Sequence, residues 1–214
     1  MGRHAAPRRT RASRWLVRVR AVLAGGLVLG IGTTATLAAW NDSEYATATV
    51  TASRFGIEGN INATGFTDHA TSPGPTLTFS PVTSQMSPNT VSFSSLVIRT
   101  TATTNIGGSL VMSTSSAPSD ATLAAQLQYA VRVVTAGTTC NQAVFDAAST
   151  AANIIVPNGT TLTTAVPANT QSLTAAAGNT VTYCVRLSMP STAPSSVQGL
   201  TTNVTWQWLG TSSA

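Results

Sequence analysis

Apolar residues recur at every second position in several stretches of this chain, and this two-residue period constrains the fold more than any other feature. It marks four longer segments, which are Val91 to about Thr104, Leu127 to Val133, Val181 to Met189 and Thr202 to Trp208. Successive side chains of a β-strand point to opposite sides of the sheet, whereas a helix repeats every 3.6 residues. The pattern therefore predicts half-buried β-strands.

Composition and turn residues agree with this prediction. Residues 39–214 contain 33 Thr and 22 Ser, and the β-branched Thr suits a pleated, half-solvated surface. A disordered Ser/Thr-rich tract is the alternative, which the strict alternation disfavours. Shorter runs that also read as strands are Thr47 to Thr51, Phe55 to Ile61, Thr76 to Ser80 and Ser109 to Thr114. Turn signatures such as Pro157-Asn158-Gly159 separate the runs.

We therefore expect an all-β fold, a jelly-roll-like antiparallel β-sandwich of seven to nine short strands. At most one short helix is expected, capped by Ser119 or Asp120 and continuing through Leu127. The stretch from Asn141 to Leu173 is weakly patterned. We expect it to cross one end of the sandwich, held at its base by a disulfide.

Residues 1–38 are predicted to be a signal peptide that is removed on export. Seven arginines lie in the first twenty positions, an uncharged Ala/Gly/Leu-rich run follows, and small residues close the segment. Cleavage is expected after Ala38 or Ala39. An uncleaved membrane anchor is the alternative, since about 19 apolar residues just span a bilayer. Contact with the membrane is therefore expected to be transient, through the signal peptide.

The charge of the remaining chain excludes one large class of partner. The full chain carries a formal charge of +5, but residues 39–214 keep only four arginines and no lysine against six acidic residues. A nucleic-acid-binding domain needs a basic stripe on its folded surface. We expect no nucleic-acid partner.

Cys140 and Cys184 are the two cysteines of the chain, and both follow the predicted signal peptide. An even number of cysteines in an exported chain favours a disulfide, and isolated cysteines without CxxC spacing are poor metal or redox sites. We predict a Cys140–Cys184 disulfide. Closing a loop of this length stabilises a fold by about 4 kcal/mol in the chain-entropy model.

Enzyme signatures are not found beyond the signal peptide. His69 is the single histidine there, so the two-histidine zinc motif of metallopeptidases cannot form, and no G-x-S-x-G nucleophile motif occurs. We predict that the protein is not an enzyme and holds no cofactor or metal. Trp206 and Trp208 could form a sugar-stacking surface, although their alternation with Thr205 and Gln207 favours a position in the core.

The scarcity of surface charge points to pairing between chains. Natural sheets protect their edges with lysines and other charges, and residues 39–214 hold ten charged residues in all. We expect residues 39–58 to form an extended segment that donates a strand to a neighbouring subunit, and residues 59–214 to form the sandwich. The alternative is that the segment pairs within its own sheet. The residues proposed for donation are Ala39, Trp40, Asn41, Asp42, Val50, Phe55 and Ile57.

The segment Thr36-Leu37-Ala38-Ala39-Trp40-Asn41-Asp42, which follows the Gly-rich apolar run, resembles the export junction of proteins cleaved by a SipW-type signal peptidase. Three further stretches are similar to the TasA/camelysin-like members of that group. They are Phe55-Gly56-Ile57, the Met86-Ser87-Pro88-Asn89 turn with the later Asn105-Ile106-Gly107-Gly108-Ser109-Leu110, and the tryptophans near the end.

This resemblance implies a secreted jelly-roll domain at the cell surface or in the extracellular matrix. For the fibre-forming members it implies assembly by donated N-terminal strands, with the chain itself or a co-exported homologue as partner. The expected function is thus a non-enzymatic fibre or matrix subunit. The alternatives are a monomeric extracellular binding module, for example for polysaccharide, and a camelysin-like peptidase, for which recognisable ligands are lacking.

Overall fold

The computed structural model describes residues 11–35, 42–114, 116–164 and 169–213. The chain divides into two compact units, residues 1–50 and 51–214. The first contains helix α1 (Arg11–Ala35), which covers most of the predicted signal peptide. Among the described residues, no helix has the length and apolar character needed to cross a membrane.

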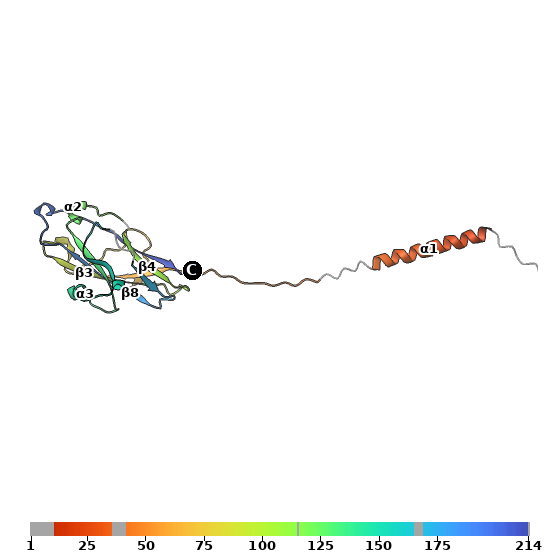
Figure 1. Cartoon of the computed structure of the whole chain (residues 1–214), viewed down its shortest axis with the longest axis horizontal. Helices are drawn as coiled ribbons and strands as arrows, with labels where there is room; N and C mark the ends of the chain where they lie inside the picture. The colour runs from red at the N-terminus through yellow and green to blue at the C-terminus, as the bar shows by residue number, and fades with distance from the viewer. Residues whose placement is uncertain (1–10, 36–41, 115, 165–168, 214) are drawn as a thin grey trace, which may run out of the picture. The chain divides into compact units, whose positions relative to one another are not determined.

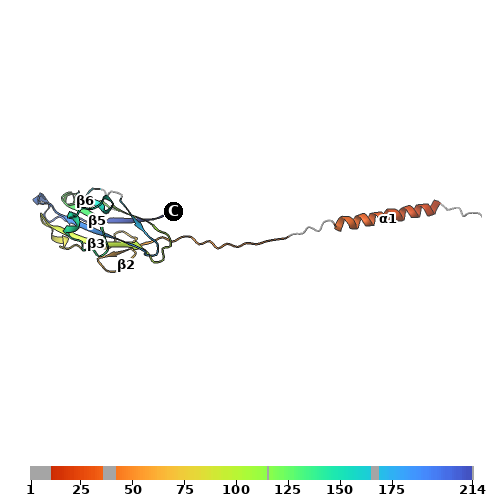
Figure 2. The same cartoon turned by 60° about the horizontal axis from the view of Figure 1, so that its bottom comes forward.

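The second unit is an all-β sandwich of two antiparallel sheets (Figures 1 and 2). In the described ranges, sheet A has six strands in the order β2-β1-β3-β8-β5-β6, and sheet B has three in the order β7-β4-β9. The strands of sheet A are β1 (Ile57–Ile61), β2 (Phe66–Thr67), β3 (Val91–Thr100), β5 (Gln128–Val134), β6 (Ile154–Thr161) and β8 (Thr180–Ser188). Those of sheet B are β4 (Gly108–Thr114), β7 (Thr170–Leu173) and β9 (Trp206–Ser212).

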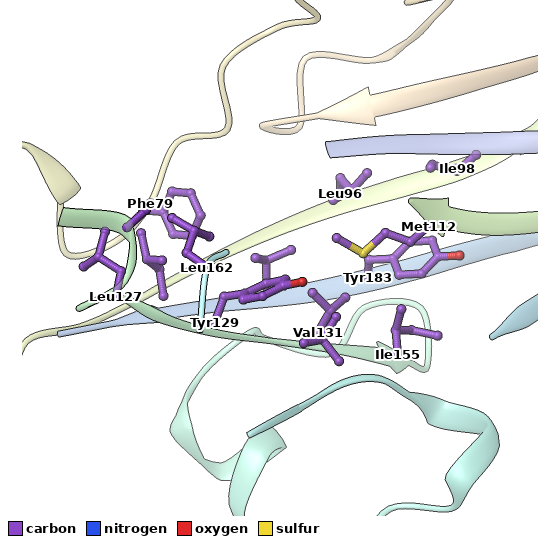
Figure 3. Close-up of a cluster of buried hydrophobic side chains, with 14 of the residues drawn as sticks. Phe79, Leu96, Ile98, Met112, Leu127, Tyr129, Val131, Ile155, Leu162 and Tyr183 are labelled. Carbon is purple, nitrogen blue, oxygen red and sulfur yellow. The ribbon is translucent and has the colours of Figure 1, made fainter. Parts of the chain in front are cut away.

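The two-residue period places alternate side chains of each strand in the core. On β8, which lies beside β3 at the centre of sheet A (Figure 1), Val181, Tyr183, Val185 and Leu187 are buried as the sequence predicts. On β3 the buried positions are Ser92, Ser94, Leu96, Ile98 and Thr100, so Phe93 points to the opposite face. Figure 3 shows Leu96, Tyr183 and Val131 of sheet A together with Met112 of sheet B.

Two expectations about the elements need correction. The predicted helix forms as α2 (Ala121–Ala124), where Asp120 Oδ1 accepts a hydrogen bond from the Leu123 N–H (2.8 Å), but a second short helix, α3 (Gln142–Asp146), is also present. It is capped by the Asn141 side chain. Residues 141–173 do not merely cross one end of the sandwich, because β6 and β7 in this stretch each form an edge strand.

Three further short segments are 3-10 turns, η1 (Thr83–Gln85), η2 (Ala151–Asn153) and η3 (Ser195–Val197). Two predicted strands are not formed. Residues 47–51 belong to no strand, and of the run 76–80 only Ser80 forms an isolated bridge, to Phe93.

The predicted disulfide is confirmed. Cys140 and Cys184 are bonded, with their Cα atoms 5.4 Å apart. Cys184 lies on the face of sheet A that points away from the main core, next to Ala130 and Phe145 of α3. The bond therefore fixes the loop that carries α3 to the centre of sheet A.

Candidate functional site

A deep apolar groove opens between the two sheets, with a volume of about 1550 Å³. Its floor consists of core side chains, among them Leu96 and Ile98 of β3 and Leu187 of β8. Its walls include irregular segments, residues 68–77, 83–88 and 193–205. The core of this sandwich is therefore incompletely filled on one side.

The groove lies beside an unpaired sheet edge. Residues 204–210, which include the first part of β9, line it. β9 pairs with β4 on one side, from Trp206↔Thr114 to Ser212↔Gly108, and is the last strand of sheet B on the other. A strand edge with free N–H and C=O groups accepts a further strand by main-chain hydrogen bonding. Sheet B can thus take a fourth strand at the place where the core lacks side chains.

Few charged side chains border the groove. Glu58, Asp68 and His69 are the ionisable residues among those that line it, and Glu58 is held by Arg99 Nε at 2.7 Å. His69 Nε2 is hydrogen-bonded to Thr67 Oγ1 (2.8 Å). Across the part of the chain that the structure describes, no three His, Cys, Asp or Glu side chains are grouped in a way that suits a metal ion. The arrangement suits the burial of an apolar segment.

Trp206 and Trp208 lie at the edge of the main core. Both are half-buried and pack against the core, where the Trp206 ring stacks on Tyr129 (centroids 6.1 Å apart) and the Trp208 ring is tilted against Tyr183 (5.6 Å). The core position that their alternation favours is confirmed. Their indole N–H groups are buried without a hydrogen-bond partner in the described residues, and both residues are among those that line the groove.

The segment that the sequence proposes as a strand donor has two parts, an exposed part before Arg54 and a part from Arg54 onward that is fixed to the sandwich. Ile57 lies in β1 of its own sheet, opposite Thr100 of β3, and packs against the core. Gly56 is fixed as well, because its carbonyl accepts hydrogen bonds from the Thr101 N–H (3.0 Å) and from Thr104 Oγ1 (3.0 Å). For Ile57 the alternative is therefore correct, because it pairs within its own sheet, whereas Phe55 lies just before β1 and belongs to no strand.

The compact unit accordingly begins at Thr51 and not at residue 59. Arg54 is the first residue that is anchored, since its N–H donates to Asn105 Oδ1 (2.7 Å) and its carbonyl accepts from the Asn105 N–H (3.0 Å). The Phe55 ring then covers two glycines, Gly108 at the start of β4 and Gly210 in β9. A Cβ atom at Gly108 would collide with this ring, and one at Gly210 would collide with Ile57 Cγ2 and lie 3.1 Å from the ring.

Residues 42–53 precede this anchor and are exposed throughout. Tyr45 and Val50 have 91% and 90% of their surface exposed, which is unusual for large apolar side chains in a folded chain. Of the other proposed donor residues, Asp42 lies in this exposed stretch. Ala39, Trp40 and Asn41, and the predicted cleavage position Ala38, lie outside the described residues.

The groove and the anchored end of the N-terminal segment are not evident from the sequence. The alternation identifies which residues face the core, but it does not show that β9 is an end strand of sheet B with one edge beside the groove. The alternation of residues 47–51 and the scarcity of charged residues are the sequence signals that point to a missing partner. Comparison with protein-family models and with curated proteins finds no match for this chain.

Proposed function

We propose that the protein is an exported, non-enzymatic structural subunit that assembles by β-strand addition. The observation that carries the proposal is the apolar groove of about 1550 Å³ beside the unpaired edge of β9. The occupant that we assign to it is the segment 42–53 of a second copy. The first residue anchored to that copy's own sandwich is Arg54, so the segment before it is free to reach a neighbour.

The pattern of the segment supports this assignment. Ala46, Ala48, Val50 and Ala52 alternate with Tyr45, Thr47, Thr49 and Thr51. In an extended strand the first set forms an apolar face and the second a largely polar one. Twelve extended residues span about 40 Å, which exceeds the length of the seven-residue β9. Asp42 and Glu44 fall on the same side as the apolar set, so residues 46–52 are the part that would cover the floor of the groove and pair with β9.

Two substitutions at adjacent positions test the assignment. We expect Val50→Asp to abolish assembly, because it places a charge on the face that enters the groove, where burying an unpaired carboxylate costs several kcal/mol. Thr49→Asp adds the same charge on the opposite face and is expected to leave assembly nearly unchanged. Light scattering and negative-stain microscopy of the chain from Ala39 onward would measure both.

A deletion complements the point variants. It should end at Ser53, because a deletion that extends to Ile57 removes Phe55 and the first residue of β1. The protein without residues 39–53 should remain folded and monomeric. Assembly of this truncated protein, or equal loss of assembly in both aspartate variants, would contradict the donor role of the segment.

Export and surface location belong to the same proposal. They rest on the composition of the signal segment and on the disulfide, which is typical of oxidising compartments, and on the resemblance to proteins with a SipW-type export junction. The partner would be a second copy or a co-exported homologue, and the location the cell surface or the extracellular matrix. A fibre subunit of the TasA type is the specific form that the resemblance favours.

The second candidate is a monomeric binding module in which the groove holds a ligand. The half-buried tryptophans leave no flat aromatic platform for polysaccharide, so this candidate requires an apolar ligand. A chain that stays monomeric at all concentrations, with Val50→Asp indistinguishable from the unmodified protein, would favour it over strand addition.

A further inference from the structure

We propose that the outer face of sheet A carries a binding site for a phosphate group, formed by Arg132 of β5 and Arg186 of β8. β5 and β8 are antiparallel neighbours in which Arg132 lies opposite Cys184 and Arg186 opposite Ala130. The two arginines are thus diagonal neighbours on one face, at a spacing of about 7–8 Å between backbones. Their guanidinium carbons lie 5.7 and 5.9 Å from the centre of the Phe145 ring.

This pair of positive charges has no negative partner in the part of the chain that the structure describes. The one ion pair found there joins Arg99 to Glu58. Asp146, which adjoins Phe145 in the sequence, accepts a hydrogen bond from Gln142 Nε2 at 2.7 Å. Burial and, second, the charge of Arg186 lower the pKa of Arg132. Two like charges at a partly buried site favour a bound counter-ion.

Several donors of the pair are unused. Arg132 is only 6% exposed, and its Nη1 donates to the Val156 carbonyl (2.9 Å) and its Nη2 to Asn158 Oδ1 (3.5 Å), but its Nε is buried without a partner among the described residues. The Nε of Arg186 is buried and unpartnered as well, and its guanidinium forms no hydrogen bond with any described residue. Guanidinium groups bind phosphate through two parallel N–H bonds, and the two terminal nitrogens of Arg186, which are neither buried nor hydrogen-bonded to a described residue, are the donors that such a ligand can reach.

The surroundings hold the site in place. Ala130, Phe145 and Cys184 form a small buried cluster on this face, and the disulfide ties Cys140 of the α3 loop to it. Two guanidinium charges match a phosphate group, which carries about −1.5 to −2 charges at pH 7, better than a single carboxylate. The site lies on the face of sheet A opposite to the groove, so it does not depend on strand addition.

Isothermal titration of the chain from Ala39 onward with inorganic phosphate, at constant ionic strength and pH 7.5, tests the proposal. We expect saturable binding with one site per chain, and acetate under the same conditions should bind much more weakly. Glycerol 3-phosphate distinguishes the two possible ligands, a phosphate ester on a partner molecule and the free phosphate ion. If it binds as tightly as inorganic phosphate or more tightly, the ligand is a phosphate ester; if it binds more weakly, the ligand is the free ion. Binding of acetate as tight as that of phosphate, or no binding of phosphate, would overturn the proposal.

Arg186→Gln should weaken phosphate binding by about tenfold or more, since hydrogen bonds to charged groups are strong. Arg99→Gln is the matched control. It removes one arginine from the same face of sheet A, but this arginine already pairs with Glu58, so phosphate binding should be unchanged. Equal effects of the two variants would show that phosphate responds to net charge alone, and the proposed site would be wrong. The titration of the unmodified chain remains decisive if Arg186→Gln does not fold.

Discussion

At the scale of single residues, two glycines make room for the first anchored side chain of the domain. A Cβ atom at Gly108 would meet Phe55 Cε2 at 2.6 Å and would collide with the Thr211 carbonyl oxygen. One at Gly210 would meet Ile57 Cγ2 at 2.8 Å. Phe55 can lie across sheet B only because both positions lack side chains. The N-terminal segment leaves the domain from this point.

We therefore expect Gly108→Ala to lower the free energy of unfolding by about 1–3 kcal/mol, the usual cost of overpacking. Gly74→Ala is the control, because nothing lies within 4 Å of a Cβ at that position, and its effect should stay within about 0.5 kcal/mol. Urea denaturation followed by tryptophan fluorescence would measure both. Equal stability of the two variants would show that Phe55 does not pack there.

The two buried tyrosines of the core differ in one hydrogen bond. The Tyr129 hydroxyl donates to the Thr164 carbonyl (3.1 Å), whereas the Tyr183 hydroxyl is buried without a partner among the described residues. Tyr183→Phe should raise stability at pH 7 by about 1 kcal/mol, since an unsatisfied hydroxyl is removed. Tyr129→Phe should lower it by about 1 kcal/mol, since a hydrogen bond is lost. Urea denaturation of both variants would show these opposite signs.

The same tyrosine gives a pH dependence. Burial raises the pKa of Tyr183, so the unfolded chain releases its proton first, at about pH 10. Stability is therefore complete below about pH 10 and falls as the pH rises toward the folded-state pKa. Tyr183→Phe removes this loss, and its alkaline unfolding midpoint should be higher than that of the unmodified protein. A midpoint that does not move would contradict the burial of this hydroxyl.

At the scale of elements, the alternation predicts the central strands well. The segments predicted around β3, β5 and β8 are all strands of sheet A, and the buried face of β8 is the predicted one. Each of these strands pairs with a neighbour on both sides and buries one of its faces in the core. The residues of that face are therefore apolar, and they appear in the sequence at every second position.

The edge elements are predicted poorly, for a physical reason. β6 and β7 are the end strands of their sheets and carry Thr, Asn, Gln and Ser at positions that the core does not constrain. Residues 47–51 have the alternation of a strand without a partner in their own domain. The alternation of a segment indicates that it favours an extended conformation. It does not indicate with which strand the segment will form hydrogen bonds.

The sequence also predicts only part of the candidate site. Sequence reasoning identifies an extended N-terminal segment as a strand donor, and it places Trp206 and Trp208 in the core. It does not separate the free part, residues 42–53, from the anchored part that begins at Arg54. That separation depends on contacts with Asn105 and Thr104, about 50 residues away, and no local pattern encodes them.

At the scale of the whole molecule, the disulfide joins the α3 loop to the face of sheet A that points away from the groove. The Cys140–Cys184 bond joins residues 44 positions apart, and removing it should cost about 4 kcal/mol in the chain-entropy model. The double variant Cys140→Ala/Cys184→Ala, measured by urea denaturation, should show this loss. A double variant as stable as the unmodified protein would mean that the bond constrains the unfolded chain little.

We propose that the groove beside β9 accepts the segment 42–53 of another copy. A synthetic peptide of these residues, added to the chain that begins at Arg54 and followed by amide hydrogen exchange, would test this directly. The β9 amides that point away from β4 should become protected, and the same peptide with Val50→Asp should give no protection. Unchanged exchange in β9, or protection at the β6 or β7 edge instead, would contradict it.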